Sequence, residues 1–84
     1  MATSVADQVR EIIAQQLDIN LDRDPGLVLP SDKLVDDMRA DVIDIVEIVI
    51  ALEDQFTIVI LDEYIEKWVT VGDVIACVEE LIKQ

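Results

Sequence analysis

Residues 38–56, MRADVIDIVEIVIALEDQF, carry the clearest pattern of polar and apolar positions in the chain. The acids Asp41, Asp44, Glu47 and Asp54 follow one another at steps of three, three and seven residues. These steps place the acids on one stripe of a helix, whereas a strand would put Asp44 and Glu47 on opposite faces. The many Val and Ile residues favour a strand by propensity alone, but the period predicts a helix.

The sequence also predicts where this helix begins. Asp41 is a residue type that caps the free amides of a first turn, and Asp44, three residues on, stands where a capping box has its acid. Val42 then occupies the first helical position.

A helical wheel at about 100° per residue separates two sides of this helix. Ile43 and Ile50 lie on one side, beside Glu47 and Asp54. The other side is apolar and should face a core; it holds Ile45, Val49, Leu52 and Phe56. Two interpretations follow. Either the helix is buried on nearly all sides, or it exposes a docking face of apolar anchors ringed by acids.

Two further segments combine helical spacing with a capping box. Ser4 to Leu17 has Ser4 as cap and Asp7 as the reciprocal acid, and the last helix has Thr70 as cap and Asp73 as its acid. The apolar stripe of the first comprises Val5, Val9, Ile12, Ile13 and Leu17. That of the last comprises Val71, Val74, Ile75, Val78, Leu81 and Ile82. Cys77, at the edge of this stripe, is interpreted as a small core residue rather than a reactive thiol.

Residues 18–40 lose the helical period and contain Pro25, Gly26 and Pro30. A connection longer than about 15 residues is unusual in a compact domain unless it packs or has a function. We therefore expect it to pack across the helices through Leu27, Val28, Leu29, Leu34 and Val35. Its segment DINLDRD suggests a calcium loop, but neither register supplies the required glycine and glutamate, so we expect no metal site.

Residues 57–61, TIVIL, form a short apolar link without a second strand to pair with. Asp62 is expected to cap a brief turn through residues 63–67, which carries Trp68 toward the core. The apolar faces of the three longer helices predict an all-α fold. We expect an antiparallel four-helix bundle of three main helices and one short one, with a long first loop, in a single domain, residues 1–84.

Charge narrows the classes of function. The chain has 6 basic and 19 acidic residues, a net charge of −13 and a pI near 4.1. This field repels nucleic acid and anionic lipid and attracts basic proteins. The absence of histidine and the single cysteine exclude a zinc site, a disulfide framework and a histidine general base within the chain, and we expect no enzyme. No signal peptide or membrane span is visible, so we expect a cytoplasmic protein without membrane insertion.

The chain resembles the acyl carrier proteins, which hold acyl groups on a 4′-phosphopantetheine arm. The family signature runs roughly D-L-G-A-D-S-L-D-x-V-E-L-V-M-x-L-E-E-x-F, and residues 37–56 read DMRADVIDIVEIVIALEDQF. Farther on, I-P-D-E-E-A-E-K-I-x-T-V-G-D-x-I is matched by residues 60–75, ILDEYIEKWVTVGDVI. The two matches align without a gap and cover nearly half of the chain. The resemblance implies the carrier fold and a cofactor arm in the family.

The departures from the signature concern the attachment site. Val42 stands at the position of the serine that receives 4′-phosphopantetheine, and a valine side chain has no nucleophilic atom. We therefore expect no cofactor on this chain as written. Arg39 stands at the family's glycine, Met38 at its leucine, Leu61 at its proline and Trp68 at an aliphatic residue. Val42 is either natural or an engineered replacement of the serine, and the sequence leaves both open.

The resemblance implies a partner-binding surface on the second and third helices. Carried over by position, its acids are Asp41, Asp44, Glu47, Glu53, Asp54, Asp62 and Glu66, and its apolar contacts are Ile43 and Ile50. In the family, basic patches on synthases, reductases and the phosphopantetheinyl transferase recognise such acids. We expect a monomeric docking subunit of a fatty-acid or related acyl-transfer pathway; the alternative is a non-carrier interaction or regulatory module that keeps the fold.

Overall fold

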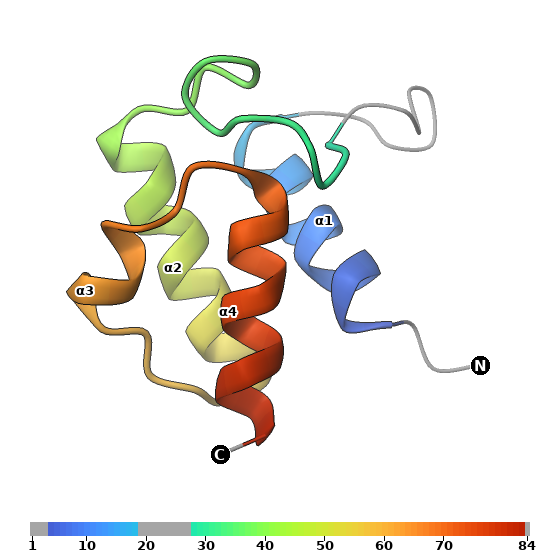
Figure 1. Ribbon diagram of the computed structural model, residues 1–84, viewed down its shortest axis with the longest axis vertical. Coiled ribbons are helices and arrows are strands. Elements are labelled where there is room, and N and C mark those ends of the chain that lie inside the picture. The colour runs from blue at the N-terminus through green and yellow to red at the C-terminus, as the bar shows by residue number, and fades with distance from the viewer. Residues whose placement is uncertain (1–3, 19–27, 84) are drawn as a thin grey trace.

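The computed structural model describes residues 4–18 and 28–83, and the regular secondary structure of these residues is helical (Figure 1). The helices are α1 (Val5–Gln16), α2 (Val42–Phe56), α3 (Asp62–Ile65) and α4 (Val71–Lys83). The predicted all-α arrangement of three main helices, one short helix and a long first connection is confirmed. Most of the segment tested for calcium ligands, together with Pro25, Gly26 and Leu27, lies outside the described residues.

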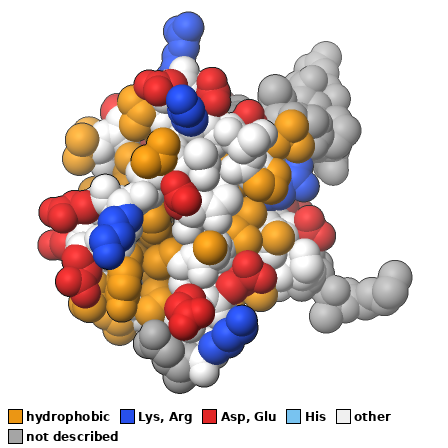
Figure 2. All heavy atoms as spheres, viewed as in Figure 1, with side chains coloured by type: hydrophobic (Ala, Val, Ile, Leu, Met, Phe, Trp, Pro, Cys, Tyr) orange, Lys and Arg blue, Asp and Glu red, His pale blue; other side chains and the backbone are white. Residues whose placement is uncertain are grey.

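Acidic side chains are numerous on the face of the molecule seen in Figure 2, and hydrophobic side chains lie exposed between them. Among the described residues, no helix has the length and apolar character needed to cross a bilayer.

The starts of α1 and α4 lie at the predicted capping residues. The Ser4 hydroxyl oxygen accepts a hydrogen bond from the Asp7 backbone N–H at 3.1 Å. The predicted reciprocal bond from the Ser4 N–H to the Asp7 carboxylate is absent, and Asp7 instead forms an ion pair with Arg10 at 3.8 Å. At the start of α4, the Thr70 hydroxyl oxygen accepts from the Asp73 N–H at 3.2 Å, and the Asp73 carboxylate accepts from the Thr70 N–H at 2.9 Å. Both caps satisfy amides that the first helical turn leaves without a partner.

The prediction that Asp62 caps the short helix is wrong. Asp62 is the first helical residue of α3, and Leu61 holds the N-cap position without a side-chain hydrogen bond. The backbone decides this, because Leu61 is still extended and its carbonyl oxygen already accepts from the Tyr64 N–H at 3.0 Å. The Asp62 carboxylate lies instead within the first turn, where negative charge is favourable.

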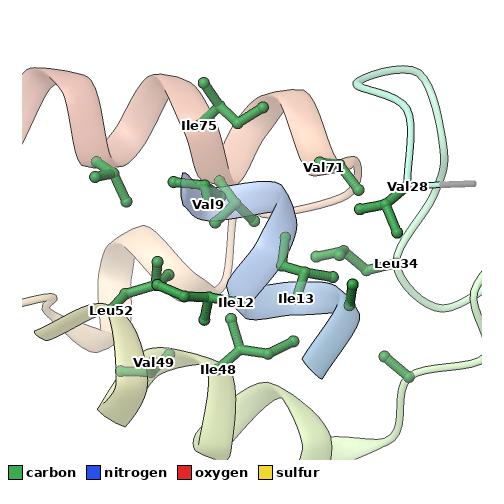
Figure 3. Close-up of a cluster of buried hydrophobic side chains, with 14 of the residues drawn as sticks. Val9, Ile12, Ile13, Val28, Leu34, Ile48, Val49, Leu52, Val71 and Ile75 are labelled. Carbon is green, nitrogen blue, oxygen red and sulfur yellow. The ribbon is translucent and has the colours of Figure 1, made fainter. Parts of the chain in front are cut away.

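The core lies where α1 packs against both α2 and α4 (Figure 3). Most of the predicted stripes contribute to it; its buried residues are Val9, Ile12, Ile13, Ala14, Val28, Leu34, Ala40, Ile48, Val49, Leu52, Ile60, Val71, Val74, Ile75 and Val78. Ile82, which was predicted to belong to the apolar stripe of α4, is 42% exposed because it lies in the last turn of this helix, beyond the packed region.

The bundle is only partly antiparallel. α2 and α4 run in the same direction and α1 runs opposite to both, as Figures 1 and 3 show. The prediction of an antiparallel bundle is therefore wrong for the pair α2 and α4. The reason is that residues 57–70, which include α3, carry the chain back along the bundle before α4 begins.

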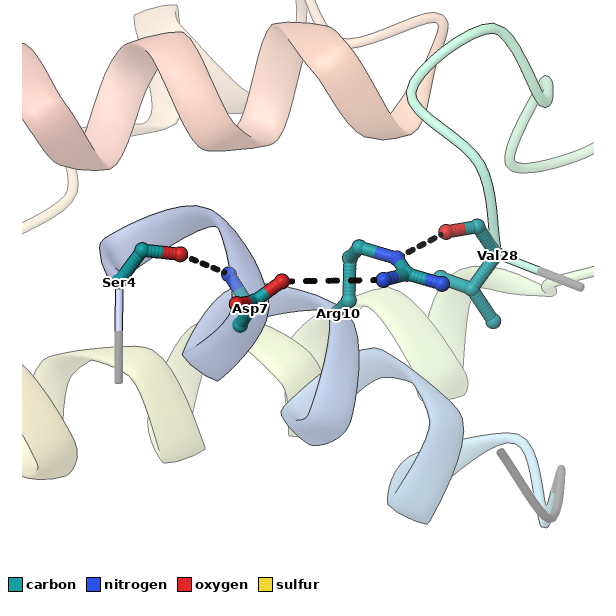
Figure 4. A network of polar contacts seen from close by, with 4 residues as sticks. All are labelled: Ser4, Asp7, Arg10 and Val28. Carbon is teal, nitrogen blue, oxygen red and sulfur yellow. Dashed lines mark hydrogen bonds and ion pairs between the residues drawn. The ribbon is translucent and has the colours of Figure 1, made fainter. Parts of the chain in front are cut away.

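Of the apolar residues of the first connection that were predicted to pack and that the structure describes, Val28 and Leu34 are buried. Val28 and Leu34 are 1% and 2% exposed, whereas Leu29 and Val35, also predicted to pack, are 43% and 59% exposed. Arg10 of α1 holds the connection, because its Nε donates to the Val28 carbonyl oxygen at 2.7 Å (Figure 4). Within each of these two pairs of neighbours, 28–29 and 34–35, one residue faces the core and the other faces solvent.

The end of this connection is fastened to the start of α4 by backbone hydrogen bonds. The Val71 N–H donates to the Asp32 carbonyl oxygen and the Gly72 N–H to that of Pro30, both at 2.9 Å. A Cβ atom at position 72 would lie 3.0 Å from the same Pro30 oxygen. Glycine therefore permits this close approach.

Candidate functional site

The start of α2 is fixed by the capping box that the sequence predicts. The Asp41 carboxylate accepts from the Asp44 N–H at 2.9 Å, and the Asp44 carboxylate accepts from the Asp41 N–H at 3.1 Å. Val42 is the first helical residue, and 77% of it is exposed. The position that the signature assigns to the cofactor is thus an exposed side chain at a helix N-terminus.

The outer side of α2 faces solvent. Ile43 and Ile50 are 67% and 60% exposed, whereas Ile48 and Leu52 on the opposite side are 1% and 0% exposed. This excludes the interpretation of a helix buried on nearly all sides and confirms the predicted exposed face. Val46 is 50% exposed beside them, and the sequence interpretation missed it. Its steps of three residues from Ile43 and four to Ile50 could have identified it.

We use the term docking surface for the acids and exposed apolar side chains of α2 and α3. It comprises Asp41, Ile43, Asp44, Val46, Glu47, Ile50, Asp54, Asp62 and Glu66. Asp44 is half-buried, and the other members are exposed. Among the described residues, one ion pair lies within 4.0 Å, and it joins Arg10 and Asp7 of α1. The acids of the docking surface therefore have no basic partner within this distance in the described part of the chain.

A groove of about 240 Å³ connects the two helices of the docking surface. Val46 and Ile50 of α2 line it together with Asp62 and Ile65 of α3. The structure thus brings Asp62 to the exposed apolar residues of α2, as expected. Glu66 is the C-cap residue of α3 and does not line this groove.

Glu53, also expected to contact partners, has an internal role. Its carboxylate accepts a hydrogen bond from the Ile60 backbone N–H at 2.9 Å, and the residue is half-buried. Ile60 is 6% exposed, so this bond anchors the link between α2 and α3 at a core residue. Glu53 and Ile60 both line the groove between α2 and α3, so this hydrogen bond also fixes part of its wall.

Arg39 adopts a backbone conformation that favours glycine. Its φ is 58°, in the left-handed region, and its N–H donates to the Val35 carbonyl oxygen at 3.1 Å. A side chain with a Cβ costs free energy in this region. The structure thus explains why the family signature has glycine here, and it places an exposed cation three residues before Val42.

The fold and this surface define a small helical carrier domain. The family model for the phosphopantetheine attachment site matches residues 7–78. The acyl carrier protein of Wolinella succinogenes is 42% identical over 76 residues, covering 90% of this chain and 95% of the relative. That of Campylobacter curvus is 38% identical over 80 residues, covering 95% of this chain and 99% of the relative. That of Helicobacter pylori is 40% identical over 74 residues, covering 88% of this chain and 90% of the relative. The chain belongs to the acyl carrier protein family.

The residues present do not fit covalent attachment of 4′-phosphopantetheine at the expected position. Val42 offers only carbon atoms to an incoming phosphate. Thr57 lies at the opposite end of α2, where it forms the C-cap, and the Thr70 hydroxyl caps α4. Neither hydroxyl replaces the missing one at the start of α2.

Proposed function

We propose that this chain is a docking subunit for fatty-acid or related acyl-transfer enzymes and does not accept 4′-phosphopantetheine. Acyl carrier proteins are carriers rather than catalysts, and we extend this to the present chain. The observation that carries the proposal is Val42, an exposed hydrocarbon side chain at the family's attachment position.

The docking surface supports recognition by basic partners. Its acids lack ion-pair partners among the described residues, and its apolar side chains remain exposed between them. Each exposed ion pair adds about 0–1 kcal/mol, so the acids act together by steering and orienting the partner. We propose the basic surfaces of synthases, acyltransferases and phosphopantetheinyl transferases as partners of a cytoplasmic monomer that binds neither nucleic acid nor membranes.

A non-carrier interaction or regulatory module is the second candidate. Arg39 favours it, because a left-handed residue with a Cβ is retained beside the unusual Val42. Such a module would occupy partner enzymes in competition with loaded carriers. The two candidates differ in the origin of Val42. A natural valine belongs to an interaction module without an arm, whereas an engineered valine replaces the serine of a carrier.

Intact mass spectrometry tests the loading. The chain and its Val42→Ser variant are incubated with coenzyme A and a promiscuous phosphopantetheinyl transferase. We expect a mass increase for Val42→Ser alone, because only this variant supplies a hydroxyl at the start of α2. Loading of the unchanged chain would refute the claim that it has no arm. Failure of both would favour the interaction module.

Charge reversal tests the docking surface. The unchanged chain should inhibit loading of Val42→Ser by occupying the same transferase. Glu47→Lys with Asp54→Lys should abolish this inhibition and leave helicity unchanged. The matched control, Glu11→Lys with Glu79→Lys, changes the net charge equally at exposed positions on α1 and α4. Equal inhibition by both double variants would remove the docking surface from the proposal.

A further inference from the structure

A second groove opens between α3 and α4. It measures about 290 Å³ and shares no lining residue with the groove between α2 and α3. Figure 2 shows hydrophobic side chains in the hollow between these two helices, flanked by acidic ones. The groove is therefore a feature separate from the docking surface.

Two of the three aromatic residues of the chain line this groove. Tyr64 and Trp68 are its only tyrosine and only tryptophan, and Ala76, Cys77 and Leu81 of α4 complete the apolar lining. A cavity of about 150 Å³ with an apolar lining already accommodates benzene. The groove is thus large enough for one bulky aliphatic or aromatic side chain.

Trp68 has an unsatisfied hydrogen-bond donor. Its indole Nε1 is buried and has no hydrogen-bond partner among the described residues. A buried donor without an acceptor is unfavourable, and indole N–H groups usually find a partner. A shift of the indole ring that brings this N–H to an acceptor would relieve the cost.

The charges around the groove favour a basic occupant. Two acids, Asp73 and Glu80, and one basic residue, Lys67, line it. Asp73 already accepts hydrogen bonds from the Val69 and Thr70 N–H groups, whereas Glu80 has no hydrogen bond or ion pair within the described structure. The net charge of −13 adds a field that attracts cations and repels anionic amphiphiles such as fatty acids.

We propose that the groove between α3 and α4 binds a basic amphipathic segment of a partner protein. One apolar side chain of the segment enters the groove against Trp68, and a neighbouring Lys or Arg pairs with Glu80. This site does not depend on the proposed function, because it uses neither Val42 nor the docking surface.

Fluorescence of Trp68 tests the site directly, because no other tryptophan contributes to the emission. The probe is a short peptide of Leu and Lys at helical spacing, without aromatic residues. Two matched peptides replace every Lys by Glu or every Leu by Ser. We expect the Leu/Lys peptide alone to shift the emission of Trp68. An equal shift with the Leu/Glu peptide would overturn the proposed chemistry of the occupant.

Variants locate the bound peptide. Ala76→Phe fills the groove from an exposed position and should weaken binding about tenfold or more, the effect of excluding one apolar side chain. Glu80→Lys should weaken it about fivefold more than Glu79→Lys, since Glu79 is exposed and does not line the groove. Circular dichroism and thermal melts establish that each variant folds; if Ala76→Phe does not, Ala76→Leu and the Glu80 comparison test the same site.

The docking surface provides the last control. Glu47→Lys with Asp54→Lys should leave the peptide-induced shift in place, although it abolishes inhibition of the transferase. Loss of the shift in this double variant, with retention in Ala76→Phe, would place the peptide on the docking surface and overturn the inference. Failure of the transferase experiment alone would leave the groove unaffected.

Discussion

Replacing Arg39 by glycine should stabilise the protein. Arg39 has a φ of 58°, where an L-residue costs about 1–2 kcal/mol relative to a relaxed conformation. Glycine avoids this cost but loses about 0.4–1 kcal/mol through the greater freedom of the unfolded chain. The backbone hydrogen bond from position 39 to the Val35 carbonyl oxygen survives the change.

The informative comparison is Arg39→Gly with Arg39→Ala. Both variants lose the same cation, so their difference isolates the Cβ atom. We expect Arg39→Gly to be more stable than Arg39→Ala by about 0.5–1 kcal/mol. For a domain of this size that raises the thermal midpoint by about 2–8 °C. Urea unfolding and calorimetry measure the two quantities.

Asp36 supplies the matched control position. It is an exposed residue of the same connection and does not have a positive φ. There the order should reverse, with Asp36→Ala more stable than Asp36→Gly by about 0.4–1 kcal/mol. The reasoning is refuted if alanine is the more stable residue at both positions.

Three further measurements examine the fold and its charges. Glu53→Ala should destabilise the protein by about 1–3 kcal/mol in urea unfolding because the Ile60 N–H loses its acceptor; equal stability of Glu53→Ala and Glu53→Gln would contradict this role. Backbone N–H groups of Thr70 and Val69 donate to Asp73 and lower its pKa below the ordinary 3.8, so its stabilising contribution is present above that pH and lost as the pH falls through the lowered folded value. Asp73→Asn should accordingly differ from the unchanged chain more at pH 6 than in strong acid, and a pH-independent difference would refute the assignment. Magnesium at low ionic strength should raise the thermal midpoint by screening a net charge of −13, and an unchanged midpoint would count against self-repulsion.

Local sequence signals predicted the helix starts well because capping depends on residues three positions apart. The capping boxes at Asp41 and Thr70 are confirmed, as is the exposed outer side of α2. The same logic failed at Asp62, because the extended backbone of Leu61 sets where α3 begins. A capping residue type predicts a helix start only when the preceding backbone permits it.

The exposed side of α2 and its surroundings were predicted in part. Ile43 and Ile50 were identified from the helical wheel, whereas Val46 was missed and Glu53 proved to anchor a core residue. The wheel describes one helix at a time. It therefore could not show that α3 lies beside Val46 or that the Glu53 carboxylate reaches the backbone of Ile60.

By itself, the sequence determined the family, the helical class, the acidic charge and the absence of a hydroxyl at position 42, because each depends on residue identity or on spacing within one turn. Tertiary structure decided the parallel course of α2 and α4, the left-handed backbone of Arg39 and the two grooves beside α3. These features arise where segments far apart in the chain pack together, and packing depends on the shapes of both surfaces at once.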